Sequence, residues 1–116
     1  TENELNVALE EMAAGNAMLY VKRGTNVGAT YLLDTDVIKV GRKTDSDVFL
    51  DDVTVSRLHA EFRREGGHYV LKDVGSLNGT YVNGELVTDP VTLRRGDEVQ
   101  IGMLKLLYLN SVSNDS

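Results

Sequence analysis

Short apolar or alternating runs separated by Gly, Asn and Asp fill residues 17–109, and this pattern constrains the fold more than any other feature. Ala60 and Phe62 fall on one face of such a run. The charged Glu61 and Arg63 fall on the other face, as a half-buried strand requires. The pattern predicts an all-β sandwich or barrel. The expected strands are 17–22, 30–33, 37–40, 48–50, 59–64, 69–72, 80–82, 85–87, 98–101 and 104–109.

Two of these runs carry further predictions. The pair Gly66-Gly67 indicates a hairpin turn between the runs 59–64 and 69–72. The run 104–109 is almost entirely apolar, so we expect it to be central in its sheet or covered on both faces.

The two ends of the chain differ from its body, which gives an expected division into a leader (1–16), one domain (17–109) and a flexible tail (110–116). The tail is small and polar. The leader is acidic and is expected to be either a short helix or a flexible flank. The helical features are apolar residues at helical spacing (Leu5, Leu9, Met12), a capping box (Thr1 with Glu4) and a possible stop (Gly15).

Composition limits the function classes. The 116 residues suit one domain, and the net charge of −6 resides mainly in the flanks, because residues 17–109 hold 13 of the 18 acidic side chains against 12 basic ones. A broad nucleic-acid surface would need a basic excess. The absence of cysteine excludes thiol chemistry and disulfides, and no apolar run approaches the length of about 20 residues that spans a bilayer. We therefore expect a cytoplasmic protein that binds neither nucleic acid nor membrane.

Four short motifs in a fixed order carry the functional signal: Gly41-Arg42, Ser56-Arg57-Leu58-His59, Asn78-Gly79-Thr80 and Val82-Asn83-Gly84. A phosphothreonine brings about −1.5 to −2 charges and three acceptor oxygens. Arg42 offers a planar fork that can donate two parallel hydrogen bonds to such a group. Ser56 adds a short hydroxyl donor, and Arg57 could add charge or a backbone N–H at the pocket wall.

The remaining motif residues suit positioning roles. His59 has no catalytic partner at a recognisable spacing, so we expect its ring to bridge two loop backbones and hold Ser56 in register with the Asn78 loop. Asn78 can clamp the backbone of an extended peptide, while Gly41 and Gly79 permit tight turns. Each motif alone also has a plain structural interpretation: Ser56 as a turn hydroxyl and Asn78-Gly79 as a hairpin turn.

Other functions stay open at this point. A phosphate-handling enzyme is disfavoured, since neither a G-x-x-x-x-G-K-[ST] loop nor a G-x-G-x-x-G after a strand is present. A sandwich that docks partners without phosphate is the main alternative. A divalent-ion site could be built from Asp45, Asp47, Asp51 and Asp52, although their spacing is not that of an EF-hand and a solvated rim is the simpler interpretation. No metal or cofactor is expected.

The motif set, extended to Gly75-Ser76-Leu77-Asn78-Gly79-Thr80, resembles the forkhead-associated (FHA) domain over residues 17–109. The resemblance implies a β-sandwich of about eleven strands that binds phosphothreonine peptides through loops at one end, without catalysis. It implies that Arg42 and Ser56 contact phosphate, Arg57 lies at an accessory position, and Asn78 contacts the peptide backbone. It further implies pocket-shaping roles for Leu77 and Thr80, and supporting roles for Gly41, His59, Gly79 and Asn83, the last bracing the Asn78 loop.

Longer stretches resemble the small actinobacterial FHA regulators of glycogen accumulation and 2-oxoglutarate metabolism: residues 21–24, 49–57 and 73–83. This resemblance implies a signalling role downstream of a Ser/Thr kinase, with phosphothreonine proteins or the kinase as partners. It also implies 2-oxoglutarate dehydrogenase and glutamate dehydrogenase as possible partners. The paired-threonine motif of such leaders is missing here, and Leu58 stands where close relatives carry a second Arg, which makes the surroundings of the pocket less basic.

Overall fold

The computed structural model describes residues 15–110, and within that range it contains eleven strands and no helix. Each expected run forms a strand whose ends agree to within one residue, so the prediction of an all-β fold is confirmed. The strands are β1 (Ala17–Arg23), β2 (Thr30–Leu33), β3 (Val37–Gly41), β4 (Val48–Phe49), β5 (Ala60–Glu65), β6 (His68–Asp73), β7 (Thr80–Val82), β8 (Glu85–Leu86), β9 (Val91–Thr92), β10 (Glu98–Ile101) and β11 (Leu104–Asn110).

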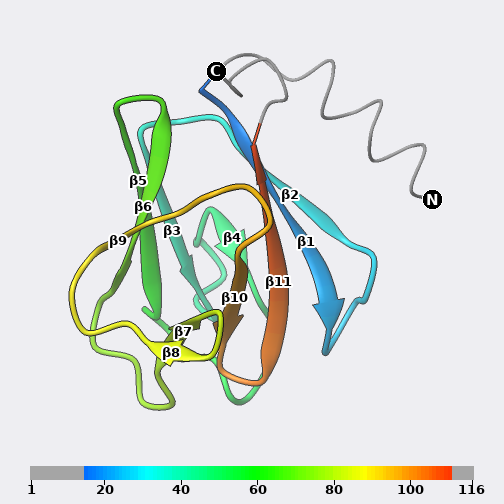
Figure 1. Cartoon of the computed structure of the whole chain (residues 1–116). Coiled ribbons are helices and arrows are strands. Elements are labelled where there is room, and N and C mark those ends of the chain that lie inside the picture. The colour runs from blue at the N-terminus through cyan, green and yellow to red at the C-terminus, as the bar shows by residue number, and fades with distance from the viewer. Residues whose placement is uncertain (1–14, 111–116) are drawn as a thin grey trace.

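The strands form two sheets that pack as a sandwich (Figure 1). One sheet has the order β2-β1-β11-β10-β7-β8, and the other has the order β4-β3-β5-β6-β9. β11 lies between β1 and β10, which confirms the expected central position of the last apolar run. In the second sheet β3 and β4 are parallel, whereas β5 and β6 form the expected antiparallel hairpin. Both turn glycines, Gly66 and Gly67, have positive φ angles, as a type I′ turn requires.

The strand β9 was not expected from the sequence. It has two residues, follows Pro90, and is defined by its pairing with β6, where Val91 lies opposite Leu71. So short a strand has no alternation to recognise, and a proline is tolerated where an edge strand begins. The expected tail also begins one residue too early, because Asn110 belongs to β11 and is buried. The predicted helix or flexible leader lies outside the described residues, except for Gly15 and Asn16.

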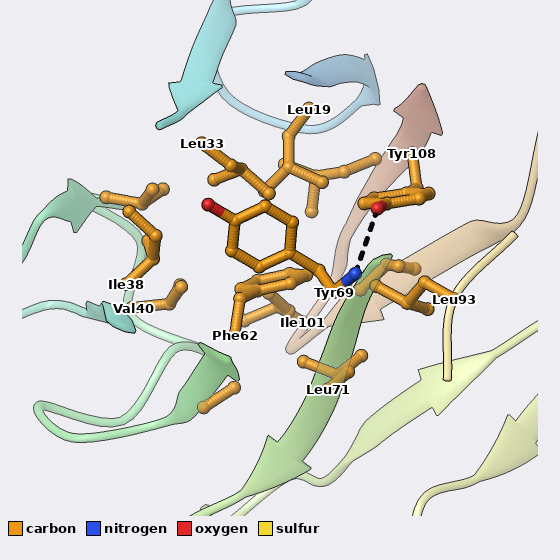
Figure 2. Packing of buried hydrophobic residues seen from close by; sticks show 14 of the residues in the cluster. Leu19, Leu33, Ile38, Val40, Phe62, Tyr69, Leu71, Leu93, Ile101 and Tyr108 are labelled. Atoms are coloured by element: carbon orange, nitrogen blue, oxygen red, sulfur yellow. Dashed lines mark hydrogen bonds between the residues drawn. The ribbon is translucent and has the colours of Figure 1, made fainter. Parts of the chain in front are cut away.

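The core lies between the inward faces of the two sheets, and Figure 2 shows the ring of Tyr69 surrounded by side chains from both. Leu19 comes from β1 in one sheet and Phe62 from β5 in the other, and both are fully buried. The backbone N–H of Tyr69 donates to the hydroxyl of Tyr108 at 3.3 Å, which joins β6 to β11 across the sandwich (Figure 2). Each fully buried large apolar side chain stabilises the fold by about 1.5–3 kcal/mol, so this core holds the loops that carry the site.

The loops that follow β3, β4 and β6, together with the β10–β11 turn, gather at one end of the sandwich, the lower end in Figure 1. β1 begins and β11 ends at the opposite end. All four sequence motifs therefore lie on or beside loops, and the first three meet at one end although up to 39 positions separate Gly41 from Thr80. Within residues 15–110 there is no helix long and apolar enough to span a membrane.

Candidate phosphopeptide site

Three loops are fastened to one another at the loop end of the sandwich. The backbone N–H of Arg42 donates to the carbonyl of Ser56 at 3.0 Å, which joins the β3–β4 loop to the β4–β5 loop. The backbone N–H of Leu77 donates to Ser56 Oγ at 2.9 Å, and Asn78 Nδ2 donates to the carbonyl of Thr54 at 2.8 Å. The structure therefore brings Arg42, Ser56 and Asn78 to one surface, as the sequence predicted.

Gly41 permits the close approach of the first two loops. A Cβ atom at this position would lie 2.0 Å from the carbonyl oxygen of Arg57, far inside contact distance. The backbone of Arg57 can therefore pack directly against the end of β3 and accept a hydrogen bond from Lys43 N at 3.3 Å. Close approach, rather than a left-handed backbone, is the reason for glycine here.

Arg42 is exposed, yet its guanidinium is anchored. Its Nε donates to the carbonyl of Val55 at 3.0 Å, directly before Ser56 in the chain. The two terminal nitrogens make no hydrogen bond or ion pair with the described residues. This arrangement fixes the plane of the fork and leaves its paired donors at the rim, where an oxyanion can accept both.

Ser56 and Asn78 each keep hydrogen-bonding capacity after fastening the loops. Ser56 Oγ accepts the amide of Leu77, so its hydroxyl proton remains to be donated. Asn78 is exposed, and its amide uses one donor on Thr54, which leaves its carbonyl oxygen and a second N–H. A hydroxyl beside a cation can bind a phosphate, and a side-chain amide that both donates and accepts hydrogen bonds can bind a peptide backbone.

His59 is fully buried and bridges two loops. Its Nδ1 accepts the backbone N–H of Ser56 at 3.0 Å, so Nε2 carries the proton and donates to the carbonyl of Gly79 at 2.9 Å. Burial lowers the pKa of His59 and favours the neutral ring, against the raising effects of the Gly79 carbonyl and of Asp73. Both ring nitrogens are occupied by the backbone, so His59 is not placed to act as a base. Its expected bridging role is what the structure shows.

Asp73 organises the β6–β7 loop, and sequence reasoning missed it. Its carboxylate accepts the backbone N–H groups of Gly75 at 2.7 Å and Ser76 at 3.0 Å, and also the hydroxyls of Ser76 and Thr80. Burial raises the pKa of Asp73, but these hydrogen bonds outweigh burial and hold the pKa below its ordinary value. The sequence did carry a signal, because an Asp with a Gly two positions later and a Ser three positions later is typical of an Asx turn.

The structure also shows the contacts of two further residues of the predicted site. Thr80 was expected to shape the pocket, which stays a prediction; its side chain is fully buried and donates to Asp73 at 2.7 Å, so it stabilises the β6–β7 loop. Asn83 was expected to brace the Asn78 loop. Instead it lies on the β7–β8 turn with φ of 51°, donates to Asp97 and accepts the amide of Glu98. It therefore braces the turn that leads into β10.

The surface around the site is open and contains no metal-binding cluster among residues 15–110. The exposed fractions are 89% for Leu77 and 59% for Leu58, and Arg57 is also exposed. Three of the four aspartates considered for a divalent ion have other partners: Asp45 is paired with Lys43, Asp47 accepts the amide of Lys39, and Asp52 accepts from Thr54. Hydrogen bonds from the hydroxyl and amide of Thr54 hold the pKa of Asp52 below its ordinary value.

Comparison with known proteins assigns the family. A profile of the FHA domain matches residues 38–102, which is more than half of the chain and includes every site residue described above. The chain belongs to the FHA domain family. It is 56% identical over 107 residues to a glycogen accumulation regulator, GarA, of Mycolicibacterium smegmatis, covering 92% of this chain and 67% of that protein.

Two further matches agree. An oxoglutarate dehydrogenase inhibitor of Corynebacterium jeikeium is 57% identical over 102 residues, covering 88% of this chain and 70% of that protein. A solved structure from a study of phosphothreonine-dependent FHA domain interactions is 33% identical with a TM-score of 0.73, covering 81% of this chain and 95% of that chain. This FHA chain thus spans about two thirds of the length of these two curated relatives.

Proposed function

We propose that this chain is a non-catalytic, cytoplasmic module that binds phosphothreonine peptides at the surface formed by Arg42, Ser56 and Asn78. The observation that carries the proposal is the anchored guanidinium of the exposed Arg42, whose Nε donates to Val55 while its two terminal nitrogens have no partner among the described residues. A dianionic phosphate matches that fork and the adjacent Ser56 hydroxyl. Asn78 is available for the peptide backbone, and Arg57 for residues beside the phosphate.

A regulatory role for this module follows from its relatives. One is named an oxoglutarate dehydrogenase inhibitor and another a glycogen accumulation regulator. We therefore propose that the chain regulates enzymes of 2-oxoglutarate and glutamate metabolism, downstream of a Ser/Thr kinase. The candidate partners are phosphothreonine proteins, the kinase, 2-oxoglutarate dehydrogenase and glutamate dehydrogenase.

Calorimetric titration tests the binding function. The chain is titrated with a phosphothreonine peptide pool and with matched phosphoserine and unphosphorylated pools. Binding confined to the phosphothreonine pool is expected. Arg42→Ala should weaken it by at least about 30-fold, because hydrogen bonds to charged groups contribute about 1.5–3 kcal/mol each. Arg94→Ala is the matched control, since Arg94 is also exposed but follows β9, away from the site loops.

The alternative function is docking to a partner without phosphate. The wild-type and Arg42→Ala proteins also distinguish this function from phosphothreonine binding. Inhibition of 2-oxoglutarate dehydrogenase by the unphosphorylated chain is measured with wild type and Arg42→Ala. If no peptide pool binds while inhibition persists in both proteins, the sandwich docks its partner without phosphate and the phosphothreonine proposal is wrong.

A further inference from the structure

Thr54 joins three segments of the chain beside the candidate site. Its carbonyl oxygen accepts a hydrogen bond from Asn78 Nδ2 at 2.8 Å, and its hydroxyl oxygen accepts one from the backbone N–H of Met103 at 2.9 Å. The same hydroxyl donates to the carboxylate of Asp52 in its own loop. Thr54 therefore links the β4–β5 loop to the β6–β7 loop and to the β10–β11 turn, although 49 positions separate it from Met103.

Asp52 holds Thr54 in one conformation. Its Oδ1 accepts both the backbone N–H of Thr54, at 2.8 Å, and the Thr54 hydroxyl. Its Oδ2 accepts the hydroxyl of Thr25 from the β1–β2 loop at 3.2 Å, so the carboxylate is itself held by a further segment. A hydroxyl has one proton to donate. Because Asp52 accepts that proton, the hydroxyl oxygen of Thr54 is left as an acceptor for the amide of Met103.

Gly102 lets the β10–β11 turn approach Thr54. A Cβ atom on Gly102 would lie 2.6 Å from both the carbonyl oxygen and the hydroxyl oxygen of Thr54, well inside contact distance. Gly102 also has a φ of 59°, a backbone conformation that favours glycine. The turn therefore packs against the carbonyl oxygen that holds the side chain of Asn78.

The hydrogen bond to Thr54 determines which way the amide of Asn78 faces. Only the nitrogen end of the amide can donate to a carbonyl, so a half-turn of the group would place two acceptor oxygens against each other. Asn78 is exposed, and its side chain makes no other hydrogen bond with the residues that the structure describes. Thr54 therefore sets the orientation of Asn78, whose Oδ1 is left to accept a backbone N–H of a peptide.

We propose that Thr54 is a positioning residue for peptide binding, whose carbonyl orients Asn78 and whose hydroxyl, held by Asp52 and Met103, keeps that carbonyl in place. The inference rests on the proposed function, because the amide of Asn78 must contact the backbone of a bound phosphothreonine peptide. It makes the β10–β11 turn, which carries none of the four sequence motifs, part of the structure that determines the affinity for the peptide.

Two substitutions at Thr54 test the role of its hydroxyl. Thr54→Val keeps the shape of the side chain and the backbone carbonyl but removes both hydrogen bonds of the hydroxyl, whereas Thr54→Ser keeps the hydroxyl. Titration calorimetry with a phosphothreonine peptide should show about fivefold weaker binding to Thr54→Val and a change of less than about twofold in Thr54→Ser. Thr30→Val is the matched control, since Thr30 is exposed on β2 at an edge of the six-stranded sheet and its variant should bind as wild type does.

A double-mutant cycle tests whether Thr54 acts through Asn78. In the Asn78→Ala background, which keeps Arg42 and Ser56, the addition of Thr54→Val should weaken binding by less than about twofold. A general loss of loop stability would instead weaken binding by the same factor in both backgrounds. Asp52→Asn, which keeps the volume of the side chain, should repeat this pattern because it replaces the acceptor of the Thr54 hydroxyl.

The side-chain amide resonances of Asn78 report its orientation without any ligand. They should shift in Thr54→Val and Asp52→Asn and keep their positions in Thr30→Val. The inference is overturned if they move in neither variant, if Thr54→Val binds the peptide as tightly as wild type, or if it weakens binding equally with and without Asn78. When wild type binds the peptide, these outcomes remove only the positioning role. If no phosphothreonine peptide binds wild type, the proposed function fails and the positioning role fails with it.

Discussion

The Nδ1 atom of His59 lies 3.0 Å from the backbone nitrogen of Ser56, and this contact fixes the protonation of the ring. An N–H group donates there, so Nδ1 must be unprotonated, and the proton resides on Nε2, which faces Gly79. A proton added to Nδ1 would face the amide of Ser56 and break the bond. The position of the candidate phosphate ligand Ser56 therefore depends on a neutral imidazole.

Stability should decline as His59 becomes protonated. Burial depresses the pKa of His59 below its ordinary value of 6.5, so the unfolded chain binds the proton first as pH falls. The contribution of His59 is complete above pH 6.5 and is lost as pH falls through the depressed pKa. Urea unfolding of the peptide-free chain at a series of pH values measures this slope. His59→Asn should reduce the dependence of the unfolding free energy on pH. The control variant His68→Gln, at an exposed histidine, should keep that dependence. An unchanged dependence in His59→Asn would contradict its assignment to His59.

Asp73→Asn should destabilise the fold by about 1.5–3 kcal/mol, because a neutral amide replaces a carboxylate that accepts hydrogen bonds from Gly75, Ser76 and Thr80. The wild-type contribution is present above the ordinary pKa of 3.8 and is lost as pH falls through the lower folded pKa. Chemical unfolding at pH 7 measures the effect. Asp36→Asn is the control, because that side chain is 88% exposed and its ion pair with Nη1 of Arg64 is long, at 3.8 Å. Equal stability of the two variants would rule out the organising role of Asp73.

Gly41→Ala should cost about 1–3 kcal/mol and also weaken phosphopeptide binding, because the added Cβ would lie 2.0 Å from the Arg57 carbonyl and must push the site loop away. Gly66→Ala is a useful contrast. Gly66 has a φ of 61° with open space around it, so alanine there should cost about 1–2 kcal/mol of backbone strain without altering the dissociation constant. Thermal unfolding and peptide titration of both variants distinguish backbone strain, which lowers only stability, from displacement of the Arg57 loop, which also lowers affinity. Normal affinity in Gly41→Ala would show that the loops tolerate the shift.

Tyr108→Phe should destabilise the sandwich by about 1 kcal/mol, since the buried amide of Tyr69 loses its acceptor across the two sheets. Burial raises the pKa of Tyr108 to about 12, so the unfolded chain releases this proton first as pH rises. Wild-type stability should therefore fall between pH 10 and about 12. The fall should be smaller in Tyr108→Phe when unfolding free energies are measured across that range. An equal fall in both proteins would assign the titration to another group.

The alternation of apolar and polar residues predicted most of the strands, because its period of two shows which face of a strand is buried. It could not find β9, because Val91 and Thr92 form a strand only through their partner β6, which is distant in sequence. At the site, Arg42, Ser56 and Asn78 were predicted from the sequence because their side chains carry the donors and acceptors that a phosphopeptide needs. Asp73 was missed, and its bond to the buried Thr80 was not expected, because this contact exists only in the folded β6–β7 loop.

The fastening of the loops separates the positions of this surface into two kinds. His59 and Gly41 contact the backbone of another loop, whereas Asp73 and Ser76 contact each other and the rest of the β6–β7 loop, so a change at any of these four positions displaces other residues of the surface. The side chains of Arg57, Leu58 and Leu77 are exposed, and that of Arg57 makes no hydrogen bond with the described residues. Substitutions of the first kind should depend strongly on one another, whereas the second kind can vary singly. If the proposed site is correct, new peptide preferences can therefore be evolved or engineered at the outward positions while the candidate phosphate site is inherited as a unit.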